Sequence, residues 1–228
     1  FGRQVVAEMN RVGMMVDVSH VSKECMMQAT AMSTSPVIGS HSSTTVVANV
    51  PRNMDDEMLA AMKKNGGVVQ MVALGSYVKV QPAERDTAVR KLNEEFFGVQ
   101  PQRGAGGRGG GGRGNQRASL PPEKLADYDR RMADIEAKWP SANVQDFANH
   151  IDHAVKVAGI DHVGISSDFD GGGGIKGWND ASETFNVTLE LVKRGYSEDD
   201  IRKLWGGNTL RVMGENQKRA TAKGRITP

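Results

Sequence analysis

The segment "MMVDVSH" at residues 14–20 is a short apolar run, rich in valine, that ends in a histidine. A second segment, "PVIGSHSS" at 36–43, repeats the pattern 21 positions later. Short apolar runs with β-branched residues predict buried strands. One histidine at the end of a strand is more often structural than chemical. Two in the same setting favour a shared role, so we expect His20 and His41 at neighbouring strand ends with their rings converging on one point.

Helices and strands alternate along the rest of the chain. Beyond strands at 14–19 and 36–40, the pattern predicts strands at 68–74 and within "HVGISSDFDG" (162–171); predicted helices cover 3–12, 22–32, the stretch from Asn53 or Asp55 to "NGG" (65–67), 84–97, 122–139, 144–159 and, with a break at "GGN" (206–208), 180–215. This alternation predicts a parallel sheet with helices outside it. Both a doubly wound sheet and a (β/α)8 barrel fit. No G-x-G-x-x-G follows the first strand, so the dinucleotide-binding version is disfavoured.

Composition excludes several classes of protein. With 228 residues, 38% of them hydrophobic and 25% charged, the chain can bury a real core. A net charge of +2 gives no reason to expect a nucleic-acid or membrane partner. Cys25 is the single cysteine, which excludes an intrachain disulfide and a thiolate metal cluster. No apolar run approaches the ~20 residues that span a bilayer. The first residues lack the pattern of a signal peptide, and we expect any targeting signal to lie in a preceding segment, so the compartment, cytoplasmic or exported, stays open.

The segment "RGAGGRGGGGRGNQR" at 103–117 differs from its surroundings. It holds eight glycines and four arginines in 15 residues. It offers no apolar surface to offset the entropy of ordering, so a disordered surface insertion at about 101–119 is expected. Such segments also bind RNA. We favour the insertion, because the segment is short and lacks interleaved aromatic residues.

The residues at the strand ends suit a metal. In a barrel the chemistry lies at the carboxyl ends of the strands, where His20, His41 and Asp168 fall. Alternation along a strand would put His41 on one face with Gly39, and Asp168 on one face with Gly164. Two imidazoles and a carboxylate suit Zn²⁺. On spacing alone, a metal site and a pair of buried structural histidines both remain open.

Five blocks in order then resemble a known family. They are "GMMVDVSHVS" (13–22), "PVIGSHSS" (36–43) with "PRN" (51–53), "GGVVQMV" (66–72), "HIDHAVKVAGIDHVGISSDFDGGGG" (150–174) and "RGYSEDDIRKLWGGNTLRV" (194–212). Together they resemble the membrane (renal-type) dipeptidases, zinc peptidases within the amidohydrolase-like TIM barrels. The resemblance covers nearly the whole chain, apart from the Gly/Arg insertion and the last dozen residues.

The resemblance implies a fold and a site. The fold would be α/β, the C-terminal half (strands five to eight) of a (β/α)8 TIM barrel, over residues 1–215, followed by a polar tail at 216–228. A binuclear zinc site would include His20 and His41, at the ends of strands five and six. By the same likeness Arg52 would bind the carboxylate of a dipeptide, and Asp168 would handle protons beside the metal-bound water.

The sequence also departs from the family pattern. The family's strand-one His-x-Asp pair and strand-three glutamate have no counterpart, so we expect this chain to be part of something longer. The "HID" string at 150–152 lies on a predicted helix, and we interpret His150 and His153 as packing residues. His162 precedes the last strand, at the wrong end for catalysis. Asp170 is a weaker rival of Asp168. Glycines 171–174 predict a flexible loop.

The family activity is hydrolysis of a dipeptide by a zinc-activated water. Because zinc ligands are missing, we expect the isolated chain to be inactive. Its open sheet edges lead us to expect aggregation or a homodimer. Two alternatives stay open: a non-catalytic half-barrel that serves as an assembly module, and an RNA-binding protein that uses the Gly/Arg segment.

Overall fold

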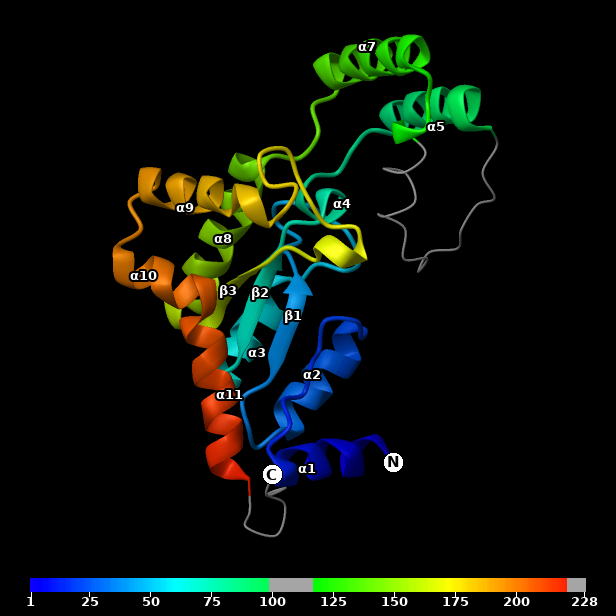
Figure 1. Cartoon of the computed structure of the whole chain (residues 1–228). Helices are drawn as coiled ribbons and strands as arrows, with labels where there is room; N and C mark the ends of the chain where they lie inside the picture. The colour runs from blue at the N-terminus through cyan, green and yellow to red at the C-terminus, as the bar shows by residue number, and fades with distance from the viewer. Residues whose placement is uncertain (99–116, 221–228) are drawn as a thin grey trace.

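A computed structural model describes residues 1–98 and 117–220. These residues form a mixed α/β structure, mostly helical, around a parallel sheet with strand order β1-β2-β3 (Figure 1). The strands are β1 (Ile38–Ser42), β2 (Val68–Val72) and β3 (Val163–Ser166); the α-helices are α1 (Gly2–Val12), α2 (Lys23–Met32), α3 (Asp56–Asn65), α4 (Gly75–Val78), α5 (Ala83–Phe97), α7 (Pro122–Lys138), α8 (Val144–Ala158), α9 (Thr184–Lys193), α10 (Glu198–Arg202) and α11 (Asn208–Arg219). Short 3-10 turns are η1 (Ile160–His162), η2 (Phe169–Gly171) and η3 (Ala181–Glu183), and η4 (Lys203–Gly207) is π-helical.

The helices begin and end where local chemistry requires. The side chain of Ser22 caps α2, and that of Asp55 caps α3, each by accepting a hydrogen bond from a backbone N–H in the first turn. Gly66 ends α3 in the left-handed conformation. The expected break at 206–208 is a kink inside η4, where Gly206 leaves helical geometry. The predicted helices are confirmed to within a few residues.

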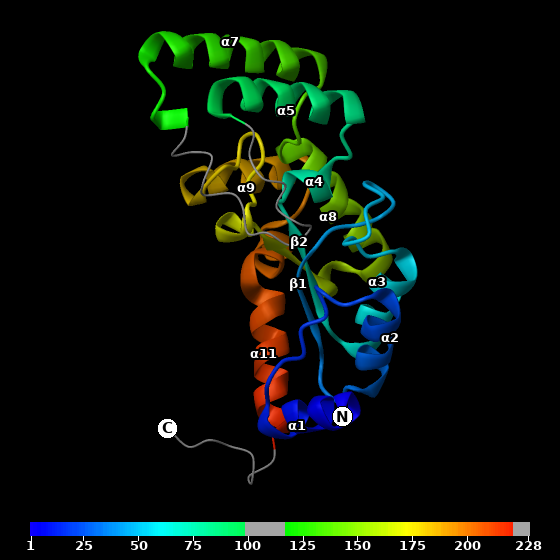
Figure 2. The same ribbon diagram turned by 90° about the vertical axis from the view of Figure 1, so that its right-hand side faces the viewer.

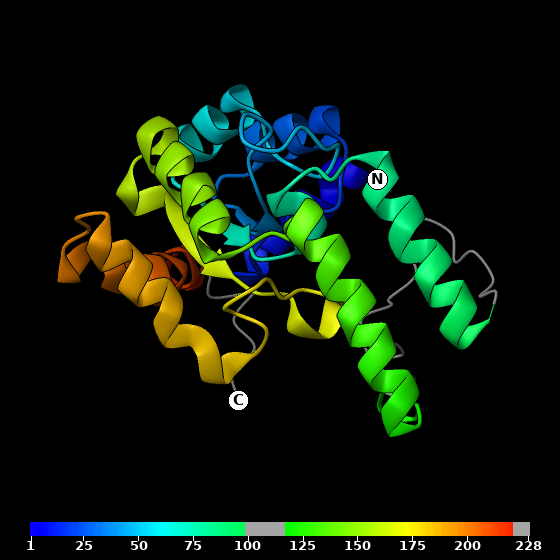
Figure 3. The same ribbon diagram turned by 90° about the horizontal axis from the view of Figure 1, so that it is seen from above.

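The core lies between the sheet and the helices on its outer side. Seen from above, α2, α3 and α8 lie along one side of the strands, and α11 continues the row past β3 (Figure 3). Strand β2 is buried on both faces, as expected of a central parallel strand. The largest fully buried apolar side chains are those of Phe147, Met26, Met54, Leu59, Met62, Met71, Ile151, Leu191 and Leu204.

The predicted strand at 14–19 is wrong in its extent. A single bridge joins Asp17 to Ile38, with hydrogen bonds from Val18 N to Ile38 O (2.8 Å) and from Ile38 N to Val16 O (2.9 Å). Beyond that bridge the Asp17 side chain accepts a hydrogen bond from Ser19 N at 3.0 Å. Local bonds of this type compete with a strand ladder, and the chain turns instead.

Strand β1 begins and ends two residues later than predicted. It covers 38–42 rather than 36–40, so His41 lies within the strand. Gly39 pairs with Val69 and Ser42 with Met71, which sets three steps of β1 against two of β2. This β-bulge breaks the alternation from which we placed His41 on the face of Gly39, since an extra residue reverses which way later side chains point.

Helices α5 and α7 form a hairpin that stands away from the sheet (Figure 2). Its core is aromatic: the Tyr128 ring lies 5.4 Å from that of Phe96 and 5.3 Å from that of Phe97, between ring centroids. The predicted Gly/Arg insertion falls between these helices. Most of it, residues 101–116, lies outside the described residues, so its disorder stays a prediction. The polar tail was predicted to begin at 216, but α11 continues to Arg219; residues 221–228 lie outside the described residues.

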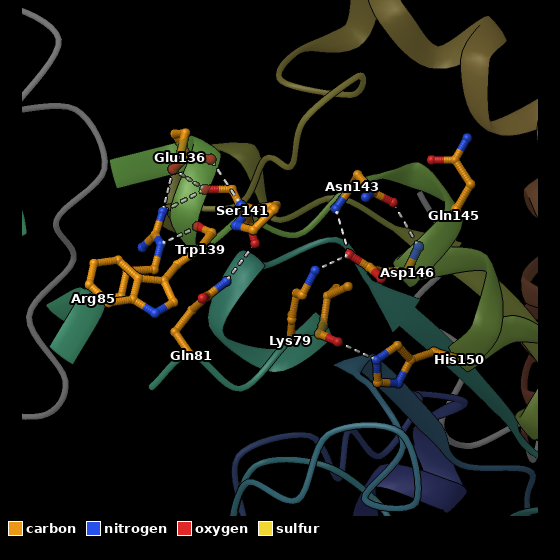
Figure 4. A network of polar contacts seen from close by, with 12 residues as sticks. Lys79, Gln81, Arg85, Glu136, Trp139, Ser141, Asn143, Gln145, Asp146 and His150 are labelled. Atoms are coloured by element: carbon orange, nitrogen blue, oxygen red, sulfur yellow. Dashed lines mark hydrogen bonds and ion pairs between the residues drawn. The ribbon is translucent and has the colours of Figure 1, made fainter. Parts of the chain in front are cut away.

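A polar cluster joins the base of the hairpin to the body (Figure 4). Arg85 contacts Glu136, donates from Nη2 to Ser141 Oγ at 2.6 Å and from Nε to Trp139 O at 3.0 Å. Nearby, Lys79 pairs with Asp146, which closes the capping box of α8. The side chains at the two ends of the hairpin are therefore tied to each other.

His150 is fully buried and links three segments. Its Nδ1 accepts hydrogen bonds from Thr44 N and Thr44 Oγ1, both at 3.0 Å. Its Nε2–H donates to Val78 O at 2.9 Å, the contact drawn at His150 in Figure 4. Because Nδ1 accepts from a backbone N–H, it carries no hydrogen. Burial lowers the pKa of His150, so the ring is held neutral. The packing role predicted for this residue is confirmed.

Acid should destabilise the fold through His150. Since its folded-state pKa is lowered, its contribution is complete above about pH 6.5, the pKa of an unfolded histidine, and is lost as pH falls below that value. The free energy of unfolding should decrease by up to about 1.4 kcal/mol per pH unit from this one group. The free energy of unfolding would be measured with denaturant between pH 5 and 8. Its decrease with falling pH should become smaller in His150→Asn and should stay as in the parent in His153→Asn. An unchanged slope in His150→Asn would contradict this.

Candidate active site

His20 and His41 meet at the carboxyl end of β1. Their Nε2 atoms are 2.6 Å apart and their ring centroids 4.6 Å apart. His20 lies in the turn after the 17–38 bridge, and His41 lies on the bulge of β1. The expected convergence of the two rings is confirmed. Both side chains reach solvent, so they are not the buried structural pair left open above.

The bulge fixes His41 through its neighbours. Ser19 Oγ accepts a hydrogen bond from His41 N at 2.9 Å, and His41 Nδ1 lies 2.7 Å from Ser40 Oγ. The Asp17 carboxylate accepts from Ser40 N at 3.1 Å and from Ser40 Oγ at 2.5 Å. Burial works against the charge on Asp17, but these hydrogen bonds outweigh it and lower its pKa.

Arg52 lies on the loop between β1 and α3. Its Nε donates to Tyr77 Oη at 3.1 Å, and its guanidinium carbon lies 5.6 Å from the centre of the Tyr77 ring. Its Nη2 is buried and has no hydrogen-bond partner among the described residues. Arg52 also lines a cavity of about 200 Å³, together with Ser19, Lys23, Ser42 and Thr45. A buried donor without a partner beside a cavity can bind an anionic or carbonyl group there.

Asp168 follows β3 in a strained turn. Its φ of 53° makes it the sole non-glycine residue with positive φ in the described part of the chain. The glycines after it are required by close contacts: a Cβ on Gly171 would lie 2.3 Å from Asp168 Oδ1, and one on Gly173 would lie 1.8 Å from Ser167 O. Gly174 N donates to Ala73 O at 2.8 Å. The loop predicted to be flexible is therefore pinned, and it holds Asp168 in an uncommon conformation.

Nearby charged and ionisable side chains shift the pKa of His20. Burial lowers the pKa of His20, and the nearby Arg52 and His41 lower it further. The carboxylates of Asp17 and Asp168 act in the opposite direction, and the net effect is a lowered pKa. Arg52, His41 and Asp168 are thus all near enough to His20 to affect its pKa. A lowered pKa keeps the imidazole neutral, as a metal ligand must be.

The side chains of His20 and His41 fit part of a zinc site. Two imidazole nitrogens that face each other suit zinc by their chemistry. Catalytic zinc usually has three protein ligands. No group of three or more His, Cys, Asp or Glu side chains in residues 1–98 and 117–220 could hold a metal ion. The convergent pair of imidazoles among the described residues is therefore smaller than the usual ligand set of a catalytic zinc.

Comparison with protein families matches residues 1–225 to the membrane dipeptidases, peptidase family M19. The chain belongs to this family. The curated relatives of this M19 chain include the dipeptidase aclJ of Aspergillus oryzae, 30% identical over 94% of this chain and 38% of the relative. The dipeptidase tcpJ of Claviceps purpurea is 29% identical over 100% of this chain and 40% of the relative.

Two solved structures share the fold of this chain. The probable dipeptidase PvdM from Pseudomonas aeruginosa superposes with a TM-score of 0.73 at 37% identity, over 96% of this chain and 54% of that one. A metallopeptidase from Rhodobacter sphaeroides, solved with a phosphinate mimic of the dipeptide L-Ala-D-Ala, shares the fold with a TM-score of 0.62 at 23% identity, over 94% and 46%. This M19 chain thus spans about 40% of the curated relatives and about half of the solved neighbours.

The remaining candidates in this M19 chain lie away from the site. His153 contacts Asp56 at 2.6 Å, and His162 contacts Gly67 O at 2.8 Å, at the amino end of β3. Asp152, of the "HID" string, binds Arg194 and Tyr196 between α8 and α9. Among the helices of the described residues, none is long and apolar enough to cross a membrane.

Sequence reasoning missed Tyr77 and Ser40. Tyr77 lies on α4 just after β2, so the rule that functional residues gather at carboxyl strand ends would have found it. Ser40 gave no signal, because its contact with Asp17 depends on how the segment at 14–19 pairs with β1.

Proposed function

We propose that this chain is the second half of a (β/α)8 barrel, carrying strands five to eight, in a zinc-dependent dipeptidase. The segment at 14–19, β1, β2 and β3 would be those strands, in chain order. Membership of the family and the parallel order of β1, β2 and β3 support this proposal. The four-strand count and the division into a barrel domain at 1–215, a Gly/Arg insertion and a tail are part of the proposal.

One observation carries the function: His20 and His41 converge, and the charges of Arg52 and Asp168 act on His20. His20 and His41 would hold the metal ions, a pair of Zn²⁺ by family likeness, with the remaining ligands from outside the described residues. When bound, zinc supplies Lewis-acid activation of water and of a peptide carbonyl.

Arg52 would bind the substrate's terminal carboxylate. Tyr77 occupies its Nε, Nη2 has no hydrogen-bond partner among the described residues, and Arg52 lines the cavity. A guanidinium binds a carboxylate with two parallel hydrogen bonds, which fixes the orientation of a dipeptide as well as its position. The free carboxylate of a dipeptide is one residue from the scissile bond, so this contact selects short substrates.

Asp168 would accept the proton of the attacking water and return it to the leaving amine. The pinned glycine loop holds the carboxylate in place, so little reorganisation is needed during proton transfer. The isolated 228-residue chain, with two ligands among its described residues, should bind zinc weakly and be inactive. A homodimer is a further proposal.

Asp168→Asn tests the proton-transfer role. Asparagine tolerates a positive φ, so the turn is kept while the base is lost. In a protein with the complete zinc site, kcat for a simple dipeptide should fall about 100- to 10,000-fold. Asp170→Asn, two residues away and exposed, is the matched control and should stay near the parent value. Equal losses in both variants would remove Asp168 from the mechanism. If the parent neither binds zinc nor hydrolyses dipeptides, the non-catalytic assembly module becomes the better interpretation.

A further inference from the structure

The hydrogen bonds around His41 determine where its ring hydrogen lies. Ser40 Oγ is 2.5 Å from the Asp17 carboxylate and 2.7 Å from His41 Nδ1. An ionised carboxylate can only accept hydrogen bonds, and a hydroxyl has a single hydrogen to give. The Ser40 hydrogen therefore points to Asp17, and Ser40 Oγ must accept the hydrogen of His41 Nδ1.

That assignment leaves the other nitrogen of His41 free of hydrogen. A neutral imidazole carries one hydrogen, so with Nδ1 protonated, Nε2 presents its lone pair. It faces His20 Nε2, 2.6 Å away. Since His41 Nε2 has no hydrogen, the hydrogen between the two rings belongs to His20. His41 is thus ready to bind a metal, whereas His20 must move its hydrogen to Nδ1 first.

We propose that Asp17 and Ser40 are positioning residues that hold His41 as its Nδ1–H tautomer and so preset Nε2 as a metal ligand. Asp17 is itself fixed, because its carboxylate also accepts from Ser19 N and Ser40 N. Ser19 fixes the backbone of His41 from the same turn. This hydrogen-bond relay from Asp17 through Ser40 to His41 adds to the proposed role of His41 as a metal ligand. It rests on that role only in the test that measures metal affinity, because the tautomer of His41 is measured without metal.

The first test needs no metal. In metal-free protein labelled with 15N-histidine, long-range 1H–15N correlation spectra distinguish the two tautomers of each ring, and His41→Gln identifies the His41 signals. His41 should be the Nδ1–H tautomer in the parent and should shift towards Nε2–H in Ser40→Ala. Ser40→Thr, which keeps a hydroxyl, should restore the parent tautomer. A parent His41 protonated at Nε2, or a tautomer that Ser40→Ala leaves unchanged, would overturn the proposal.

The second test measures zinc affinity by chelator competition in a protein with the complete site. Ser40→Ala and Asp17→Asn should each bind zinc about 10- to 100-fold more weakly, the usual effect of losing a group behind a ligand. Ser40→Thr should recover most of the affinity. Ser35→Ala is the matched control, because the Ser35 hydroxyl is buried without a hydrogen-bond partner in the part of the chain described. Equal weakening by Ser35→Ala would indicate a general structural effect and would refute the relay. If no variant binds zinc, the proposed function fails, and the tautomer spectra alone decide the relay.

Discussion

Replacing His41 by alanine should weaken zinc binding and lower kcat/KM for dipeptides by more than about 100-fold, in a protein that contains the complete site. Losing a group that only supports a ligand already costs 10- to 100-fold, and His41 is proposed as a ligand itself. Its Nε2 lies 2.6 Å from that of His20, and alanine removes this nitrogen from the pair. Bound zinc after dialysis and initial rates at saturating metal would be measured together.

The matched control is His162→Asn. It removes an imidazole at the opposite end of the sheet, and the asparagine amide can replace the hydrogen bond to Gly67 O. Zinc content and rate should then stay at the parent level. Equal losses at positions 41 and 162 would show that any histidine change perturbs the fold, and His41 would lose its assignment as a ligand.

Arg52→Lys should lower kcat/KM for dipeptides with a free carboxylate by about 10- to 100-fold, and should leave the corresponding dipeptide amides nearly unchanged. A hydrogen bond to a charged group contributes about 1.5–3 kcal/mol, and lysine keeps the charge while losing the paired geometry. The amide substrate lacks the carboxylate, so it has nothing further to lose. The parent should therefore prefer the free acid, and the variant should lose most of that preference.

Arg11→Lys provides the control for an arginine change that does not touch the site. Arg11 lies on α1, where its guanidinium is paired with Glu8 at the surface. Both substrates should be hydrolysed at parent rates. If Arg52→Lys slows the acid and the amide equally, Arg52 supports the loop rather than the substrate carboxylate, and carboxylate recognition must be assigned elsewhere.

The sequence was sufficient for the helices and for the meeting of the two histidines. Caps such as Ser22 and Asp55 and the glycine after α3 are local signals, so the helix bounds could be predicted closely. The meeting of His20 and His41 followed from a general property of parallel sheets, since consecutive strands end at one edge. Neither inference required knowledge of register.

Register was the information that the sequence lacked. The bulge in β1 depends on its pairing with β2, and the residue types at 39–42 do not indicate a bulge. The same limit hid Ser40, whose partner Asp17 is distant in sequence and comes near through the bridge between Asp17 and Ile38. The glycines at 171–174 were misjudged for a related reason: their conformational freedom suggested flexibility, whereas the structure uses their missing side chains to admit the Asp168 carboxylate and the Ser167 carbonyl.

The hairpin of α5 and α7 has a consequence for how this part of the chain can change. Its ends are close, because Gln81 Nε2 donates to Pro140 O at 3.1 Å, and its interior is filled by its own aromatic rings. The crossover from β2 to β3 is completed by α8, which packs against both strands. Helix α8 thus completes the connection between β2 and β3, and the hairpin is an addition to that connection. Its length and composition can vary between relatives, or be replaced by a short linker, without rerouting the strands that carry His41 and Asp168.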